Sequence, residues 1–423
     1  MSDTDVLILN EGNWWDDYSQ QKYLLIILTL TKNNVSFIDV FMLAASRLCK
    51  RGEFILRFER GLPSHEKLLD AAGIYDFKLI TNRQKLATQY VFRFDGRVTK
   101  SGYQMALTSN YSESCRSLFK EVFNHTISTE FWSWKYPKDK NVSSVVALNG
   151  DEVVAHYGLC HRNAIYNGLE LGFAQACDVM VTPSSRGAMS SSVFYELVKL
   201  GEKPFYAENS PVSVIYGFPH GRHYKLGARL KLYEPISPIM EVVYQFDRLD
   251  NTFNSALDDA LDNTALNNCA LDNITQSEVG PTLKQGVESA LSIMKGSKDT
   301  LLLARSYLYI LQRYVYHPEF KYQIYCVDSC YFVIKQAGKK ILLMDYLGEL
   351  VFYPQRLMLL VSFLAERFPG YSLNLWCLED VSTTFIAPDK VVDTGAVFVC
   401  KKYSSNLPNF NRWWISMGDT EFM

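Results

Sequence analysis

Residues 171–232 constrain this chain most, because strand and helix patterns alternate there around a turn of small and hydroxyl-bearing residues. Residues 173–181 are mostly apolar and typical of a strand, residues 182–192 (TPSSRGAMSSS) interrupt it, and residues 193–198 begin a helix. Free backbone N–H groups and the helix dipole favour a phosphate where such a turn leads into a helix. The sequence therefore predicts a ligand that carries a pyrophosphate, bound at this turn.

The alternation continues beyond the turn. Residues 213–216 predict a strand that ends at Gly217-Phe218-Pro219, residues 220–227 predict a short helix, and residues 229–233 predict a further strand.

The first hundred residues predict a small α/β unit. Residues 6–9, 53–58 and 89–94 are typical of strands, and residues 64–69 are typical of a capped helix. Residues 23–48 carry helical apolar spacing that is interrupted at Asn33-Asn34. We find no set of catalytic residues in these first hundred residues, so the role of the unit stays open.

Composition favours a globular protein of two or three domains, since the 423 residues are 48% apolar and 21% charged. The net charge of −2 indicates neither a nucleic acid nor a membrane surface as partner. Nine cysteines without paired spacing, mostly inside apolar runs, predict free thiols in a reducing compartment and no metal site. The acidic N-terminus predicts no signal peptide, and the longest apolar run, residues 24–28, is too short to span a bilayer, so we expect a cytoplasmic protein.

Between the N-terminal unit and the central turn the sequence predicts a strand, two helices and a hairpin. The strand covers residues 103–107, and the helices cover residues 112–123 and 129–136, the second ending at Pro137. Asn149-Gly150-Asp151 is a strong hairpin signal between strands at residues 144–148 and 152–159.

Residues 103 to about 235 resemble the GNAT superfamily of acyl-CoA-dependent N-acyltransferases. The resemblance rests on the run FWSWKY at 131–136, the Asn149-Gly150 hairpin, the pattern V-x-V-x-P-x-x-R-G at 179–187, and Tyr216-Gly-Phe-Pro219 followed by Leu226-Gly227. The chain is most similar to a subgroup with a second GNAT-like half, which includes enzymes of surface-polysaccharide biosynthesis.

The C-terminal half predicts a second α/β domain behind a polar segment. After a strand at residues 239–243, an Ala-Leu-Asp/Asn motif recurs between residues 256 and 273, which indicates a loop or weak helix, or alternatively a partner-binding helix. Helices are expected at residues 307–314 and 354–368, and strands at residues 322–327, 331–335, 340–345 and 372–377. Through the closing Trp413-Trp414-x-x-Met-Gly-Asp419, this half resembles the second GNAT-like half, and without a phosphate turn it is expected to be cofactor-free.

The expected fold is therefore a mixed-sheet α/β protein with tandem GNAT-like domains. Its expected parts are a small α/β unit at 1–100, an acyl-CoA-binding domain at 101–245, a polar low-complexity segment at 246–300 and a second GNAT-like domain at 301–423.

The resemblance implies acyl-CoA as co-substrate, with acetyl-CoA or a short hydroxyacyl-CoA as candidates. Backbone groups of Val179, Met180 and Val181 would hold the pantetheine arm and the thioester. The residues that would hold the diphosphate are Arg186, Gly187, Ala188, Met189, Ser190 and Ser191. Met189 and Ser191 depart from the small residues of the family pattern, so a plain helix cap is the alternative.

The resemblance also directs attention to proton carriers. His223 and Tyr224, which precede Gly227, are the candidates for protonating the departing thiolate. The base is unassigned, because Gln175 stands where many members of the family have a carboxylate. The other candidates are Asp178, which regular alternation places on the strand face opposite Gln175, the histidines His156 and His161, and Glu208, with a water relay as a further route.

The acceptor would be a small amine, and the subgroup implies an amino group on a nucleotide-linked amino sugar. Trp132 and Trp134 predict core packing or a lip over the cofactor, or stacking on a flat acceptor, and Tyr216 and His220 are further candidate contacts. Two other functions are a non-catalytic GNAT-derived binding module and a transferase that uses aminoacyl-tRNA. The second predicts a basic surface, which the net charge does not favour.

Overall fold

The computed structural model describes most of the chain. The described residues are 6–10, 23–30, 37, 40–41, 44–45, 48–59, 64–74, 77–84, 88–94, 103–108, 111–137, 144–186, 192–206, 210, 212–249, 253, 255–257, 259, 274–403, 407–410 and 412–420. The chain forms two compact units, the first made of Met1–Cys160 and Ala176–Pro211, the second of His161–Gln175 and Val212–Met423. This division differs from the four consecutive segments expected above. Each unit is described separately.

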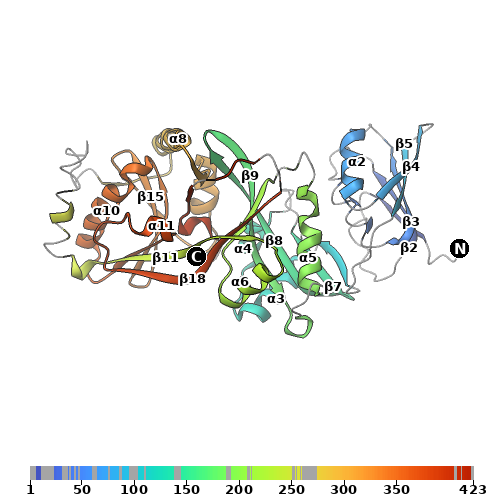
Figure 1. Ribbon diagram of the computed structural model, residues 1–423, viewed down its shortest axis with the longest axis horizontal. Coiled ribbons are helices and arrows are strands. Elements are labelled where there is room, and N and C mark those ends of the chain that lie inside the picture. Colours follow the sequence, from blue (N-terminus) through green and yellow to red (C-terminus); the bar gives the residue numbers. More distant parts are fainter. Residues whose placement is uncertain are drawn as a thin grey trace. The chain divides into compact units, whose positions relative to one another are not determined.

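Unit 1 begins with a five-stranded sheet in the order β1-β2-β3-β5-β4 (Figure 1). Its elements are β1 (Val6–Asn10), β2 (Tyr23–Leu30), β3 (Leu48–Phe58), α2 (His65–Ile74), β4 (Phe77–Gln84) and β5 (Thr88–Phe94). The first three strands run parallel, whereas β4 and β5 pair antiparallel. Phe41, Phe54 and Phe92 pack edge to face beside this sheet.

One expectation for this region is wrong, because residues 23–30 form a strand and not the start of a helix. The run YLLIILTL is almost continuously apolar, so its sequence lacks the apolar–polar alternation that indicates a strand, although Ile26, Leu28 and Leu30 are buried and the residues between them only partly so. The described residues 37, 40, 41, 44 and 45 are helical, so the helical spacing holds only in the later part of the segment.

The second part of unit 1 carries the elements expected before and after the central turn. They are β6 (Gln104–Leu107), α3 (Ser112–Phe123), α4 (Thr129–Lys135), β7 (Val145–Asn149), the first nine residues of β8 (Glu152–Tyr166), the last six of β9 (Leu169–Val181) and α5 (Val193–Glu202). β6 pairs antiparallel with β7, and β7 forms the predicted hairpin with β8. Buried residues of α3, α4 and the strands, among them Cys115, Leu118, Trp132 and Val146, make one core.

Unit 2 is built on a long mixed sheet. Its strands are β10 (Val214–Gly217), β11 (Glu234–Gln245), β12 (Thr275–Gln276), β13 (Thr300–Leu303), β14 (Gln323–Val327), β15 (Cys330–Ala337), β16 (Lys340–Leu347), β17 (Ser372–Leu378), β18 (Lys390–Lys402), β19 (Arg412–Trp414) and the adjoining parts of β8 and β9. Their order is β12-β14-β15-β16-β17-β11-β18-β10-β9-β8-β13-β19. The helices include α6 (Gly221–Arg229), α8 (Pro281–Lys295), α9 (Tyr307–Ile310), α10 (Tyr353–Arg367) and α11 (Glu379–Ser382).

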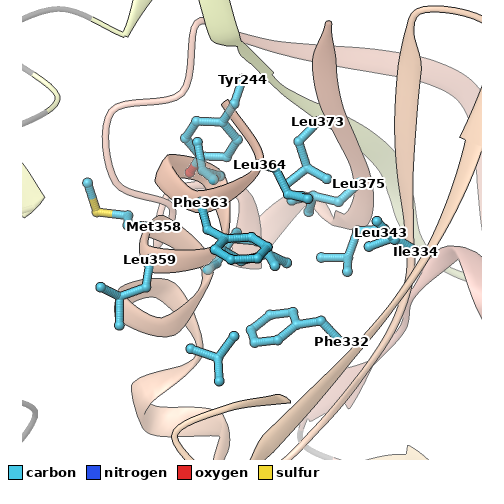
Figure 2. Close-up of a cluster of buried hydrophobic side chains, with 14 of the residues drawn as sticks. Tyr244, Phe332, Ile334, Leu343, Met358, Leu359, Phe363, Leu364, Leu373 and Leu375 are labelled. Atoms are coloured by element: carbon cyan, nitrogen blue, oxygen red, sulfur yellow. The ribbon is translucent and has the colours of Figure 1, made fainter. Parts of the chain in front are cut away.

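Helix α10 packs on strands β14, β15, β16, β17 and β11 of this sheet and joins the parallel strands β16 and β17. Figure 2 shows Phe363 and Leu364 of the helix among Phe332, Leu343 and Leu375 of the strands. Nine residues of α10 are buried, which explains why its sequence is apolar nearly all round.

Two further expectations are wrong. Residues 229–233 do not form a strand, because α6 extends to Arg229 and a turn leads into β11 at Glu234. The polar low-complexity segment expected at 246–300 contains the regular helix α8, whose Leu283, Val287 and Met294 pack in a core of unit 2. The repeats at Ala260, Ala265 and Ala270 lie outside the described residues. In the part of the chain that the structure describes, no helix has the length and apolarity that a membrane span requires.

Candidate functional site

The C-terminal end of β9 contains a backbone distortion at Asp178. This residue has φ 45, which lies in the left-handed region that a residue with a side chain occupies at a cost of roughly 1–2 kcal/mol. The hydroxyl of Tyr136 lies 2.7 Å from Asp178 Oδ2 and 3.4 Å from Cys177 Sγ. Successive side chains of a regular strand point to opposite faces, so contact of both with one hydroxyl shows that the alternation is interrupted here. Regular alternation therefore does not hold between Cys177 and Asp178.

The side chain of Asp178 is held by two neighbours from α4 and its C-terminal cap. Lys135 Nζ donates to Asp178 Oδ1 at 3.0 Å and lies 2.9 Å from Oδ2, and both side chains are almost completely buried. Tyr136 donates its hydroxyl proton to the other oxygen. Burial is the main cause, and the negative charge of Asp178 the second, that raises the pKa of Tyr136 well above its ordinary value. The hydroxyl group therefore keeps its proton and remains a donor.

The main chain of Asp178 is held by His156 of β8. His156 Nδ1 lies 2.7 Å from the carbonyl oxygen of Asp178, and the imidazole is completely buried. Burial lowers the pKa of His156 to about 4, so the ring is neutral near pH 7 and its Nδ1–H donates to that carbonyl. Nε2 is buried without a hydrogen-bond partner among the described residues.

Gly158 makes this arrangement possible. A Cβ atom at this position would lie 2.2 Å from the Tyr136 hydroxyl and 2.5 Å from the carbonyl oxygen of Cys177. Any side chain would therefore displace the Tyr136 hydroxyl from Asp178. The sequence interpretation missed Lys135, Tyr136 and Gly158 as partners of Asp178, and a lysine inside the aromatic run FWSWKY was the signal that could have indicated a buried charge.

The strand end and the turn after it have the predicted order. Val179 is exposed, Met180 is buried and Val181 is partly buried. A short turn, Pro183–Ser185, leads to the exposed Arg186, whose Nε donates to the carbonyl oxygen of Val181 at 3.2 Å.

Further along, Gly187, Ala188, Met189, Ser190 and Ser191 lie outside the described residues. Ser192 then caps α5, its Oγ accepting the backbone N–H of Tyr195 at 3.3 Å. Among the described residues, the strand, the arginine and the capped helix N-terminus thus follow one another as a phosphate-binding turn requires.

The two tryptophans expected at the acceptor differ in exposure. Trp132 is 1% exposed and packs against the rings of Tyr136 and His156, so core packing, the first of the alternatives, is what the structure shows. This burial leaves no face of its ring for stacking on an acceptor. Trp134 is partly exposed and contacts Phe131.

In unit 2 the remaining candidates lie on and near α6. His220 and His223 are exposed and Tyr224 is partly buried, so all three reach the surface of this unit. Tyr216 is 1% exposed and its hydroxyl donates to the carbonyl oxygen of Asp419 at 3.3 Å. The expectation that Tyr216 contacts an acceptor is therefore wrong, because the ring belongs to the core of unit 2.

Gly227 has a packing role that the sequence did not show. The hydroxyl of Tyr233 lies 3.1 Å and 3.0 Å from the carbonyl oxygens of His223 and Tyr224, and a Cβ at Gly227 would be 2.2 Å from that hydroxyl. His161 is partly buried, and Glu208 lies outside the described residues.

Unit 2 contains a second buried charge cluster. Arg305 donates to both oxygens of Asp419 at 2.9 Å, is paired with Asp345, and donates to Ser416 at 3.1 Å. Tyr314 donates to Asp345 at 2.7 Å. The charges in this cluster are paired, and it ties the C-terminal segment to β16. No metal-binding group of histidine, cysteine, aspartate and glutamate side chains occurs among the described residues.

The region around Asp178 is similar to a known type of domain. Residues 105–230 match the model of the acetyltransferase (GNAT) domain. This match covers the strand end, the turn and α5, and it supports an acyltransferase. Among curated proteins, none matches the sequence significantly.

Solved structures are similar to this chain. A conserved protein of unknown function from Enterococcus faecalis V583, described as a probable N-acyltransferase, superposes with a TM-score of 0.50 at 11% identity, covering 71% of this chain and 72% of that one. A GCN5-related N-acetyltransferase from Kribbella flavida gives a TM-score of 0.48 at 11% identity, with coverage of 71% and 72%. At such low identity the likeness to the first protein is one of fold, and it confirms the mixed α/β class.

Proposed function

We propose that the protein is an N-acyltransferase that moves an acyl group from acyl-CoA to an amine by direct attack in a ternary complex. The single observation that carries this proposal is the match of residues 105–230 to the GNAT domain, which includes the distorted strand end and the turn before α5. The described residues of this region are consistent with a bound acyl-CoA, because a strand end with one exposed residue, Val179, is followed along the chain by an exposed arginine and a capped helix.

In this proposal the chain supplies binding and orientation. The N–H group of Val179 or of Met180 stabilises the oxygen of the thioester carbonyl as negative charge develops on it, and Arg186 with the N-terminus of α5 binds the diphosphate. The amine nitrogen forms a bond to the carbonyl carbon, the carbon–sulfur bond breaks, and the thiolate of CoA leaves with a proton. His223 or Tyr224 stays the predicted donor of that proton, and the base stays unassigned.

Finer parts of the proposal come from the sequence resemblance. We propose a nucleotide-linked amino sugar as acceptor, acetyl-CoA or a short hydroxyacyl-CoA as donor, a second GNAT-like half in the C-terminal region, and a cytoplasmic location. His220, exposed at the start of α6, and Trp134 remain candidate acceptor contacts.

Calorimetric titration of the purified protein with acetyl-CoA tests the proposal. We expect micromolar binding by the unaltered protein and loss of at least tenfold in affinity in Arg186→Glu, because a carboxylate there would repel the diphosphate. Lys67→Glu is the matched control, since it makes the same charge change at an exposed residue of α2, outside the matched region. A folded protein that does not bind acetyl-CoA would refute the catalytic proposal and favour a non-catalytic binding module.

A further inference from the structure

We propose that Lys135, Tyr136 and His156 are positioning residues that fix the main chain at Asp178, so that the N–H groups after it are held in place for the acyl carbonyl of acyl-CoA. This inference rests on the proposed function and adds to it a set of residues that act through the backbone. None of the three side chains is expected to touch the reacting atoms.

The first step of the argument is that Asp178 needs external support. A residue with a side chain seldom adopts a positive φ inside a strand, and such a conformation persists where its surroundings determine it more than once. Aspartate tolerates the left-handed region better than most residues, but tolerance alone does not select it.

The second step is that three groups from two elements supply that support. Lys135 and Tyr136 lie at the end of α4 and hold the carboxylate at 2.9 Å and 2.7 Å, whereas His156 on β8 holds the carbonyl oxygen at 2.7 Å. The side chain and the main chain of one residue are thus fixed independently. Rotation of the peptide group after Asp178 would break the bond to His156.

The third step is that the supported residue lies directly before the one exposed residue at the described end of this strand, Val179. Asp178 and Met180 are buried, whereas Val179 between them is 37% exposed. A distortion in a strand re-aims the residues that follow it, and here those residues are the ones proposed to meet the thioester.

The fourth step excludes a simpler role for the same residues. The carboxylate of Asp178 is already paired with an ammonium group and a phenol, and Nδ1 of His156 is bonded to a carbonyl oxygen. Nε2 of His156, the ring atom that could accept a proton, is completely buried, and Asp178 is almost completely buried, so neither group is accessible to an acceptor. A buried ion pair is also weak evidence for stability, because well-packed apolar residues often replace one without loss. A role in defining the local backbone accounts for the charges better.

The test compares the affinities of acetyl-CoA and CoA, because only the former carries the acyl carbonyl. We expect the unaltered protein to bind acetyl-CoA more tightly by up to about tenfold, the range of one hydrogen bond. Tyr136→Phe and His156→Leu should lose this margin while their affinity for CoA changes less than threefold. His156→Asn, which places an amide N–H where Nδ1 was, should restore most of the margin.

Tyr157→Phe is the matched control. Tyr157 is a buried tyrosine of the same strand as His156, but its hydroxyl donates to Glu202 at 3.3 Å and does not contact Asp178. This variant should keep both the margin and the affinity for CoA. Circular dichroism establishes that each variant is folded.

The outcomes separate this inference from the proposed function. If the unaltered protein binds neither nucleotide, the proposed function fails and this inference with it. If the unaltered protein binds both, the inference alone is overturned by any of three results: no margin in the unaltered protein, a margin retained in Tyr136→Phe and His156→Leu, or equal losses for both nucleotides.

Discussion

The substitution Gly158→Ala tests the packing around Asp178 most sharply. The new methyl group would lie 2.2 Å from the Tyr136 hydroxyl, 2.5 Å from the carbonyl oxygen of Cys177 and 2.8 Å from Cε1 of His156. The Tyr136 side chain can move away, but only by breaking its bond to the carboxylate of Asp178, and the carbonyl oxygen belongs to the main chain of β9.

The magnitude follows from two costs. Insertion of a methyl group into a packed site costs about 1–3 kcal/mol, and loss of a hydrogen bond to a buried charged group costs about 1.5–3 kcal/mol. We therefore expect Gly158→Ala to lower the free energy of unfolding by about 3–5 kcal/mol. Gly280→Ala, at the N-cap of α8 where a Cβ would have no neighbour within 4 Å, should lower it by no more than about 1 kcal/mol, the loss of a favourable cap residue.

Urea denaturation followed by circular dichroism measures both variants under the same conditions. The packing argument would be refuted if Gly158→Ala changed the free energy of unfolding by less than 1 kcal/mol relative to Gly280→Ala. It would also be refuted if the methyl group were accommodated with the Tyr136 bond intact, which the unaltered margin between acetyl-CoA and CoA would reveal.

Three further predictions concern charge and burial. Burial lowers the pKa of His156 from 6.5 to about 4, so its contribution to stability is complete above pH 6.5 and is lost as the pH falls through 4, by about 3 kcal/mol in total. The free energy of unfolding, measured by urea denaturation at several pH values, should therefore depend less steeply on pH in His156→Asn, and equal dependence would contradict this. Arg305→Met leaves the buried carboxylates of Asp345 and Asp419 without their cation, so we expect the free energy of unfolding to fall by about 3–5 kcal/mol, against less than about 0.5 kcal/mol for Arg412→Met at an exposed residue. Similar urea midpoints for the two variants would show that the cluster does not stabilise the protein by this amount. Burial raises the pKa of Cys377 to about 12 and of Cys400 to about 11, so a thiol-specific reagent at pH 8 should modify these two residues only when the protein unfolds. Peptide mass identifies the labelled residues, and rapid labelling of either one in the folded protein would contradict its burial.

Local patterns predicted most of the secondary structure, because the elements concerned are amphipathic or bounded by strong turn signals. The helix at 112–123 agrees with α3, and the Asn149-Gly150 turn joins β7 and β8 as expected. The strand β2 was mistaken for a helix because a short, almost continuously apolar run has no diagnostic period. The apolar residues of helix α8 recur at helical spacing. The helix was nevertheless missed, because it follows polar repeats and was included in the same low-complexity segment.

The candidate site was predictable only in part. The strand, the turn and α5 were located from the sequence, because small residues between a strand and a helix are a local signal. The positive φ of Asp178 was not predictable, since it depends on contacts with Lys135, Tyr136 and His156, which lie 22 to 43 residues away in the sequence. The burial of Trp132 and Tyr216 likewise depends on tertiary packing, because the residue type alone does not decide whether a Trp or Tyr ring lies in the core or at the surface.

Transfer of an acyl group to an amine tests the central claim most directly. The protein would be incubated with [13C]acetyl-CoA and a panel of nucleotide-linked amino sugars and simple amines, and products would be identified by mass spectrometry while released CoA is measured. We predict that CoA release depends on the amine, that one amine gains the labelled acetyl group, and that Arg186→Glu reduces the rate at subsaturating acetyl-CoA. Release of CoA at the same rate with and without every amine, by a protein that binds acetyl-CoA, would contradict the account.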